Sequence, residues 1–124
     1  KNLFPTILTD RGYEFSDPDS LELNDKGQRR TSIFYCDPQA PHQKGAIEQA
    51  HKLLRYKLPK SRSFDTLTQD DLYESLSHIN SYTLNSIGSL TPYTMMAISF
   101  GTDILKKLKV REIDPDLVDL NPII

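Results

Sequence analysis

Short β-branched and apolar runs near the start of the chain predict two strands. Residues 6–9 (Thr-Ile-Leu-Thr) end at the turn-forming Asp10-Arg11-Gly12, which indicates a buried strand whose end lies at the carboxyl edge of a sheet. Asp10 is therefore expected to point into a crevice beside that edge. Residues 31–35 predict a second strand, with Ile33 and Tyr35 on one face and Phe34 on the other.

Helical periodicity dominates the rest of the chain. From Lys44 to about Leu58, apolar residues recur at helical spacing, and Pro59 stops the helix. Further helices are predicted over residues 17–23, 68–85, 91–100 and 103–108, where capping residues or proline mark several of the starts. The apolar stripe expected on the first long helix consists of Ile47, Ala50, Leu54 and Leu58.

The segments between and after these elements lack periodicity. Two prolines within residues 37–43 predict a loop, and residues 24–28 predict a turn. The tail from Val110 is expected to form an extended arm or to be disordered. Single side chains are assigned by residue type and context: Cys36, Met95 and Met96 are expected to be buried, and His78 is expected on the surface.

Composition limits the class of protein. The 124 residues fit one domain, and 26% charged residues without a long apolar run predict a soluble protein with no membrane span and no signal-like start. The single cysteine excludes an internal disulfide and a Cys-rich zinc site, and it suits a reducing cytosol. A net charge of −2 argues against a free-standing DNA-binding domain, so any affinity for nucleic acid is expected to be local.

Two acids are candidate metal ligands: Asp10 after the first strand and Glu48 within the helix from Lys44, with 37 residues between them. Mg²⁺ prefers carboxylate oxygens, and two such ions about 3.5–4 Å apart can activate an attacking hydroxyl and stabilise a leaving oxygen in phosphodiester chemistry. Taken alone, Asp10 is explained equally well as an aspartate that stabilises a turn. Glu48 alone is explained as a solvent-exposed helix residue that forms ion pairs with Lys44 and Lys52, four residues away on either side. Only their combination favours a metal site.

The segments around these acids resemble a known superfamily of DNA-processing enzymes. They are similar to the second and third catalytic acids of the transposase and retroviral integrase superfamily, and in particular to the IS30-like transposases. The resemblance is good from Pro5 to Leu58, is weaker to Phe100, and fades over the tail. The stretches that carry it are Ile7-Leu8-Thr9-Asp10-Arg11-Gly12, Tyr35-Cys36-Asp37-Pro38 and the run from Pro41 to Arg55.

This resemblance implies an α/β fold of the ribonuclease H type, of which the chain would supply the C-terminal half of the integrase core. Residues 1–101 would form the partial catalytic core, and residues 102–124 a short helix and an extended tail. Because the chain starts without methionine close to its first strand, it is expected to be a fragment whose parent carries a further strand and a first catalytic aspartate upstream. An exposed sheet edge would then favour a homodimer or a higher homo-oligomer.

The resemblance also implies a reaction and a set of roles. The intact protein is expected to use Mg²⁺ or Mn²⁺ to cleave DNA and transfer strands during integration, recombination and transposition, in the bacterial cytosol near the nucleoid. Asp10 would bridge both metal ions and Glu48 would bind one, while Gly12 and Gly45 would let the backbone approach the substrate. The residues expected to contact DNA are Gln43, Lys44, His51, Lys52 and Arg55.

Two departures from the family pattern keep a second hypothesis open. The turn at residues 87–92 (Ile-Gly-Ser-Leu-Thr-Pro) fits the family, but residues 81–86 lack the expected cations, and Thr94 occupies the place of an expected acid. The alternative is a catalytically inactive DNA-binding or oligomerisation module derived from a transposase. His and Cys residues show no zinc-site spacing, and Asp37 fits a loop cap better than a further metal ligand.

Overall fold

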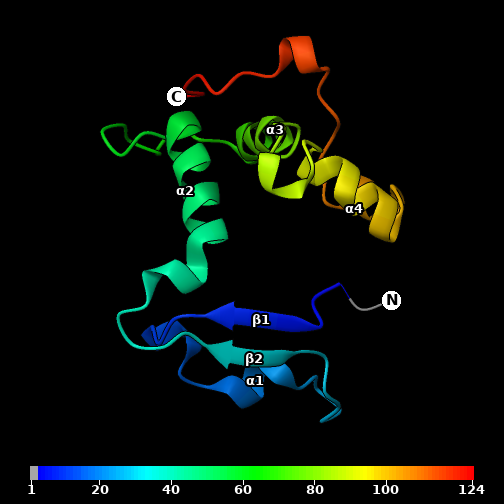
Figure 1. The fold of residues 1–124 in the computed structure, drawn as a ribbon. Helices are drawn as coiled ribbons and strands as arrows, with labels where there is room; N and C mark the ends of the chain where they lie inside the picture. The colour runs from blue at the N-terminus through cyan, green and yellow to red at the C-terminus, as the bar shows by residue number, and fades with distance from the viewer. Residues whose placement is uncertain (1–2) are drawn as a thin grey trace. The chain divides into compact units, whose positions relative to one another are not determined.

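The computed structural model describes residues 3–124, which form two compact units that divide between Glu48 and Gln49. The first unit holds a small parallel sheet, and the second holds most of the helices (Figure 1). This is a mixed α/β chain, as the sequence predicts at the level of fold class. Within the described residues, no helix is both long enough and apolar enough to cross a membrane.

The first unit is built on two parallel strands, β1 (Thr6–Thr9) and β2 (Ser32–Tyr35). They lie side by side and point the same way, with the short helix α1 (Pro18–Glu22) between them in the sequence and packed against β2 (Figure 1). The Glu22 carboxylate accepts a hydrogen bond from the Ile33 N–H at 2.9 Å and pairs with Arg29 at 3.1 Å. Both predicted strands are confirmed, and so is the Asp17 cap of α1.

The expected burial of the first strand is wrong. Leu8 and Phe34 are register partners on neighbouring strands, and they are 51% and 57% exposed. Alternation places them on the same sheet face, and that face remains open to solvent, whereas Thr9 is buried. A parallel sheet normally has both faces covered, so a two-stranded sheet leaves its apolar residues with too few neighbours to bury them.

Helix α2 (Gly45–Lys57) leads into the second unit, which continues through α3 (Gln69–Asn80), α4 (Pro92–Phe100) and α5 (Asp103–Lys107). The predicted capping box is present: Thr68 Oγ1 accepts the Asp71 N–H at 3.1 Å, and the Asp71 carboxylate accepts the Thr68 N–H at 2.9 Å. Helix α3 ends at Asn80, earlier than the predicted residue 85. A separate 3₁₀ turn, η3 (Asn85–Ile87), follows it.

The core of the second unit differs from the predicted one. In α2 the side chains of Ile47 (46% exposed) and Ala50 lie in solvent, and burial begins only with Leu53 and Leu58. Met95 is 37% exposed, so its expected core position is also wrong, whereas Cys36 is buried as predicted. The reason is that a side chain on an apolar helix stripe is buried only where another element of the fold packs against that turn of the helix. The buried apolar residues of this unit are Leu53, Leu58, Ile79, Leu105 and Ile113.

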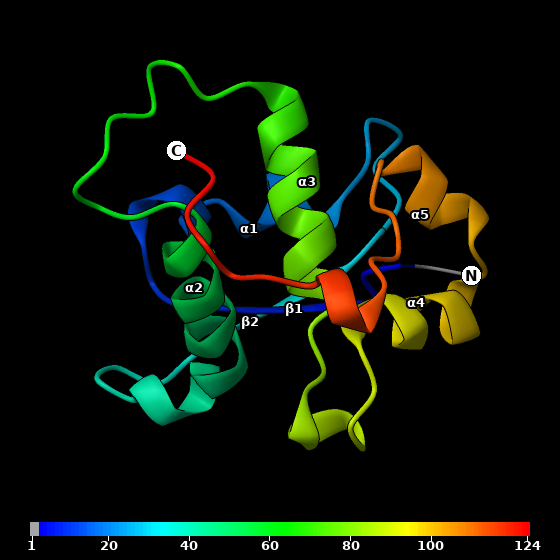
Figure 2. The same cartoon turned by 90° about the horizontal axis from the view of Figure 1, so that it is seen from above.

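Residues 111–123, here called the strap, follow α5 and run along α3 to the end of α2 (Figure 2). Side chains of α3 and of its C-cap residue accept main-chain N–H groups of the strap: Ser77 Oγ from Arg111 at 3.1 Å, and Ser81 Oγ from Ile113 at 2.9 Å. The last contact is the Ile123 N–H to the Lys57 carbonyl at 2.9 Å. The tail is therefore extended apart from a 3₁₀ turn, η4 (Pro115–Leu117), and it is bound to α3 and α2 at several points. Of the two expectations, the extended arm is confirmed.

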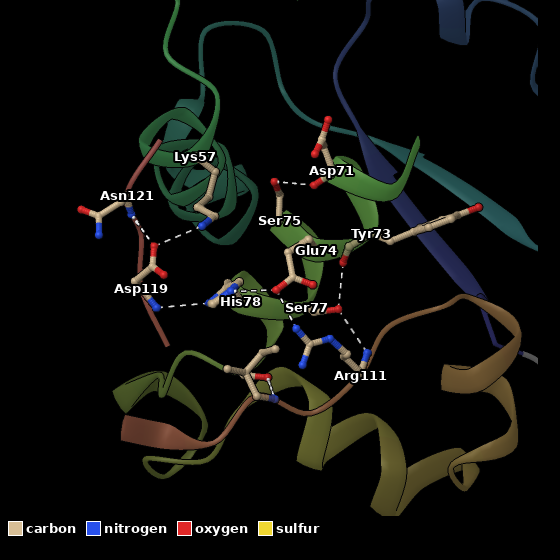
Figure 3. Close-up of polar contacts among 12 residues, drawn as sticks. Lys57, Asp71, Tyr73, Glu74, Ser75, Ser77, His78, Arg111, Asp119 and Asn121 are labelled. Atoms are coloured by element: carbon tan, nitrogen blue, oxygen red, sulfur yellow. Dashed lines mark hydrogen bonds and ion pairs between the residues drawn. The ribbon is translucent and has the colours of Figure 1, made fainter. Parts of the chain in front are cut away.

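His78 is buried, with 8% of its surface exposed, and the expectation of a surface histidine is wrong. Its Nδ1 accepts the Asp119 N–H at 3.1 Å, and its Nε2 lies 3.2 Å from the Glu74 carboxylate (Figure 3). Because Nδ1 is an acceptor, the proton of the neutral ring sits on Nε2 and is donated to Glu74. The ring thus joins α3 to the strap through both nitrogens.

Charge pairs reinforce the strap at both ends. The buried Lys57 ammonium lies 3.2 Å from Asp119, and the Arg111 guanidinium lies 2.6 Å from Glu74. The pKa of Asp119 lies below its ordinary value because its carboxylate accepts the Asn121 N–H and, to a lesser degree, a hydrogen bond from Lys57. The pKa of Glu74 is lowered mainly by the Arg111 hydrogen bond, which outweighs the opposing effect of partial burial.

The acid dependence of folding should reflect the Glu74 and Arg111 pair. Because the folded pKa of Glu74 lies below its ordinary 4.5, the pair's stabilisation is complete above that value and is lost as the pH falls through the lower folded pKa. Glu74→Gln should lower the free energy of unfolding at about pH 6, and the difference from the parent should shrink towards about pH 3. Urea unfolding followed by circular dichroism measures this. Glu112→Gln, an exposed change in the same strap, is the control, and equal, pH-independent effects of both changes would contradict the assignment.

Candidate active site

Asp10 lies immediately after β1, at the carboxyl end of the parallel pair. The ladder continues past the strand, since the Cys36 N–H donates to the Thr9 carbonyl at 2.8 Å. Asp10 itself is exposed, and its Oδ1 accepts the Gly12 N–H at 3.0 Å, which orients the carboxylate beside the strand end. Sequence and strand geometry therefore place this acid where ligands commonly bind in parallel sheets.

Gly12 has an ordinary backbone, with φ of −58°. A Cβ added there would come within 2.6 Å of the Glu14 carboxylate, which sits at the end of a flexible side chain. Beside this turn lies a cavity of about 340 Å³ whose lining includes Arg11, Phe15 and Tyr35. None of these three residues was expected to have a role of its own in the site. The signal in the sequence that points to them is a cation next to Asp10 with aromatic residues nearby.

Two loops meet after the strand ends. The Arg11 guanidinium donates to the Cys36 carbonyl at 3.4 Å, which ties the Asp10 turn to the end of β2. Gln43 holds the following loop closed, because its amide accepts the Asp37 N–H at 2.7 Å and donates to the Asp37 carboxylate at 2.9 Å. Asp37 is thus bonded within its own loop. Gln43, expected to contact DNA, has this loop-closing contact in the structure.

Glu48 lies in the first turn of α2 and is exposed. A carboxylate in this position also stabilises the helix through the positive end of its dipole, so its placement has a purely structural explanation as well. Gly45, at the start of the same helix, is exposed and has open space where a Cβ would lie. Lys44 ends the preceding 3₁₀ turn, η2 (Pro41–Lys44), and its side chain lies outside the described residues.

The remaining candidates lie farther along α2 on the same stripe as Glu48. His51, Lys52 and Arg55 follow it at spacings of three, four and seven residues, which share one face of a helix. All three side chains are exposed, and the Arg55 guanidinium also reaches the Leu58 carbonyl at 3.5 Å. The stripe therefore presents one acid and a row of cationic or titratable side chains to solvent.

The candidates fall into the two units. Asp10, Gln43 and Glu48 belong to the first unit, whereas His51, Lys52 and Arg55 belong to the second, joined by α2. Among residues 3–124, no three His, Cys, Asp or Glu side chains form a group that could hold a metal ion. The donors that the chain does offer, two exposed carboxylates at a strand end and in a helix, are of the hard-oxygen kind that Mg²⁺ takes together with several waters.

Comparison with known proteins identifies distant relatives among transposases and integrases. The chain is 27% identical over 92 residues to the transposase for insertion sequence element IS4351 of Bacteroides fragilis, a match that covers 74% of this chain and 27% of that protein. It is 32% identical over 74 residues to the putative integrase ORF3 of Spiroplasma virus SpV1-R8A2 B, covering 60% of this chain and 22% of the relative.

A third relative is the transposase for insertion sequence element IS1086 of Cupriavidus metallidurans, 28% identical over 65 residues, with 52% of this chain and 19% of the relative covered. The chain is a distant, partial relative of transposases and of an integrase. It spans about a quarter or less of the length of these relatives. No protein-family profile matches the chain, and no solved structure matches it.

Proposed function

We propose that the chain is part of a catalytic core that cleaves DNA and transfers its strands with Mg²⁺ or Mn²⁺, in which Asp10 and Glu48 are metal ligands. The observation that carries the proposal is the relation to transposases and an integrase, combined with two acids in the predicted order within one compact unit. The match to the first relative covers 92 of the 124 residues, so it leaves out at most 32 residues at either end. It must therefore include residues 33–92, and hence Glu48. The intact protein would act in the cytosol on the bacterial chromosome or on mobile DNA.

Asp10 and Glu48 would each supply a carboxylate ligand to the metal. The Gly12 N–H to Asp10 Oδ1 bond fixes the orientation of one carboxylate, and the first turn of α2 carries the other on a rigid element. Bound metal would supply Lewis-acid activation of a hydroxyl and stabilisation of the departing oxygen. Two carboxylates are few for such a site. By resemblance to the superfamily, a third aspartate from an upstream strand would complete the set within a ribonuclease H-like sheet.

DNA would lie along the exposed stripe of α2. Lys52 and Arg55, with His51 when protonated, can contact phosphates, and such contacts position a duplex without reading its sequence. The overall charge of −2 requires this affinity to be local. Glu48 shares the stripe, so the same contacts would bring the backbone next to the proposed metal ligand. Lys44 and Gln43 would flank the start of the helix.

A second candidate function is a DNA-binding or oligomerisation module that has lost catalysis. Two observations favour it: the described residues offer no cluster of three metal-binding side chains, and residues 81–86 carry no cation. Under this alternative the α2 stripe would still bind phosphates, while the acids would have no metal to hold. A DNA-binding module of this kind would therefore differ from the proposed enzyme in what Asp10 and Glu48 do.

The metal-ligand roles are tested by DNA nicking and joining in a protein extended through the upstream strand, with Mg²⁺ or Mn²⁺ present. Asp10→Asn and Glu48→Gln should each reduce the rate by about 10²-fold or more, the scale of losing one preorganised electrostatic partner. Asp25→Asn and Glu112→Gln remove exposed carboxylates elsewhere and should leave the rate unchanged. Activity that survives in the Asp10 and Glu48 variants would rule out the metal site. A folded, inactive parent would favour the binding module.

The phosphate contacts are tested on the chain itself by measuring the salt dependence of its binding to duplex DNA. Arg55→Gln should reduce the slope of log K against log salt by about 0.9, the contribution of one phosphate contact. Arg62→Gln changes the same charge at an exposed position in the loop after α2, and it should leave the slope as it is. Equal slopes for both variants would mean that α2 does not face the DNA.

A further inference from the structure

The strap is bound to α3 and its C-cap through side-chain acceptors of two kinds. Two are serine hydroxyls, which keep the same protonation state throughout the physiological range. The other is the ring of His78, whose Nδ1 accepts the Asp119 N–H at 3.1 Å. Imidazole is the side chain whose charge normally changes between about pH 5 and 8. The contact at Asp119 therefore differs from the serine contacts in that its acceptor can titrate there.

The two nitrogens of His78 respond to a proton in opposite ways. Nδ1 accepts the Asp119 N–H through its lone pair, so a proton on Nδ1 leaves two N–H groups facing each other. Nε2 lies 3.2 Å from the Glu74 carboxylate, one turn earlier in α3, and this contact becomes an ion pair when the ring is charged. A proton would therefore strengthen the contact within α3 and break the contact with the strap.

The charges around the ring are balanced while the ring is neutral. Glu74 of α3 pairs with Arg111 of the strap at 2.6 Å, and Asp119 of the strap pairs with Lys57 of α2 at 3.2 Å. A proton on His78 adds a positive charge to this neutral set. Because burial disfavours a charged ring, charging favours a state in which the strap has moved off and water reaches the imidazole.

The last residues of the strap are joined to α3 and α2 through Asp119. Figure 3 shows Asp119 in contact with both the Lys57 ammonium and the His78 ring. Its carboxylate also accepts the Asn121 N–H at 2.9 Å, and the Ile123 N–H then reaches the Lys57 carbonyl at the end of α2. Residues 119–123 therefore form one segment, and loss of the bond to His78 removes its connection to α3.

We propose that His78 is a pH-dependent switch for the strap: when Nδ1 takes up a proton, residues 119–123 leave α3 and the end of α2, while the ring stays paired with Glu74. Neutral pH favours the bound segment and acid pH the released one. Residues 111–113 stay bound at both, because their acceptors are serines. The switch lies within the second unit and does not depend on whether Asp10 and Glu48 bind metal.

The test is the protection of four strap amides against hydrogen exchange, measured by NMR on the ¹⁵N-labelled chain from about pH 8 to about pH 5. Protection at Asp119 and Ile123 should fall by up to about tenfold for each pH unit below the midpoint of the His78 titration, the slope of a release linked to one proton. The Arg111 and Ile113 amides should keep their protection. Constant protection at Asp119 and Ile123, or an equal loss at all four amides, would overturn the proposal.

The neighbouring acids do not contribute to a change in this range. The pKa of Glu74 lies below its ordinary 4.5, chiefly because of the hydrogen bond from Arg111. The pKa of Asp119 lies below its ordinary 3.8, chiefly because its carboxylate accepts the Asn121 N–H. Both carboxylates are therefore charged from about pH 5 to 8, and the expected loss of protection reports on the imidazole.

Substitution separates the proton of the ring from its acceptor role. His78→Asn can place an amide oxygen near the position of Nδ1, and this oxygen takes up no proton in the range. Protection at Asp119 and Ile123 should then be independent of pH. His42→Asn changes an exposed histidine of the first unit and should leave the pH dependence of the parent unchanged. A parent-like pH dependence in His78→Asn would overturn the proposal, and if that variant fails to fold, the four amides of the parent decide it.

Discussion

The parallel pairing of β1 with β2 is the constraint on which the candidate site depends. The register from Thr6 opposite Ser32 to Thr9 opposite Tyr35 brings both strands to an end at the same edge. The Asp10 turn and the loop that leads to α2 therefore begin side by side, and the Arg11 contact to the Cys36 carbonyl joins them. A shift of one residue in this register would turn the side chains of β1 to the opposite sheet face and displace the Asp10 turn relative to the end of β2. The position of the first acid is thus a property of strand pairing.

The second unit depends on a different interaction, the binding of a main-chain segment by the side chains of a helix. Ser77, His78 and Ser81 accept N–H groups from a strap whose regular structure is limited to one 3₁₀ turn, η4 (Pro115–Leu117). Buried main-chain donors are costly when unpaired, so the Ser81 acceptor allows the Ile113 N–H to be buried with its side chain. The strap also reaches the end of α2 through Lys57, which connects the cationic stripe of that helix to the helical core.

Local signals predicted the elements well and burial poorly. The capping box at Thr68, the Asp17 cap and the proline starts are encoded within a few residues, and the structure has all of them. The buried face of α2 and the exposure of Leu8 depend on which elements pack against them, which periodicity does not specify. His78 was missed because no spacing in the sequence marks a side chain that accepts a bond from a segment 41 residues away.

The candidate site shows the same division between local and distant information. Strand and helix patterns placed Asp10 at the end of the first strand and Glu48 within the long helix that follows Lys44, and the structure has both placements. The loop-closing role of Gln43 and the cavity lined by Arg11, Phe15 and Tyr35 arise from contacts between segments and could not be read from spacing. Whether the two acids converge on one ion depends on tertiary geometry, and it stays a prediction from the resemblance.

Paramagnetic broadening by Mn²⁺ in the ¹⁵N-labelled chain tests that convergence most directly, because it reports proximity to the ion even when binding is weak. The account predicts that sub-stoichiometric Mn²⁺ broadens the amide signals of Gly12 and Glu48 together, and that Asp10→Asn removes both effects. Broadening confined to other acids, such as the exposed Asp70, or broadening at Glu48 that persists in Asp10→Asn, would contradict the claim that these two carboxylates share a metal site.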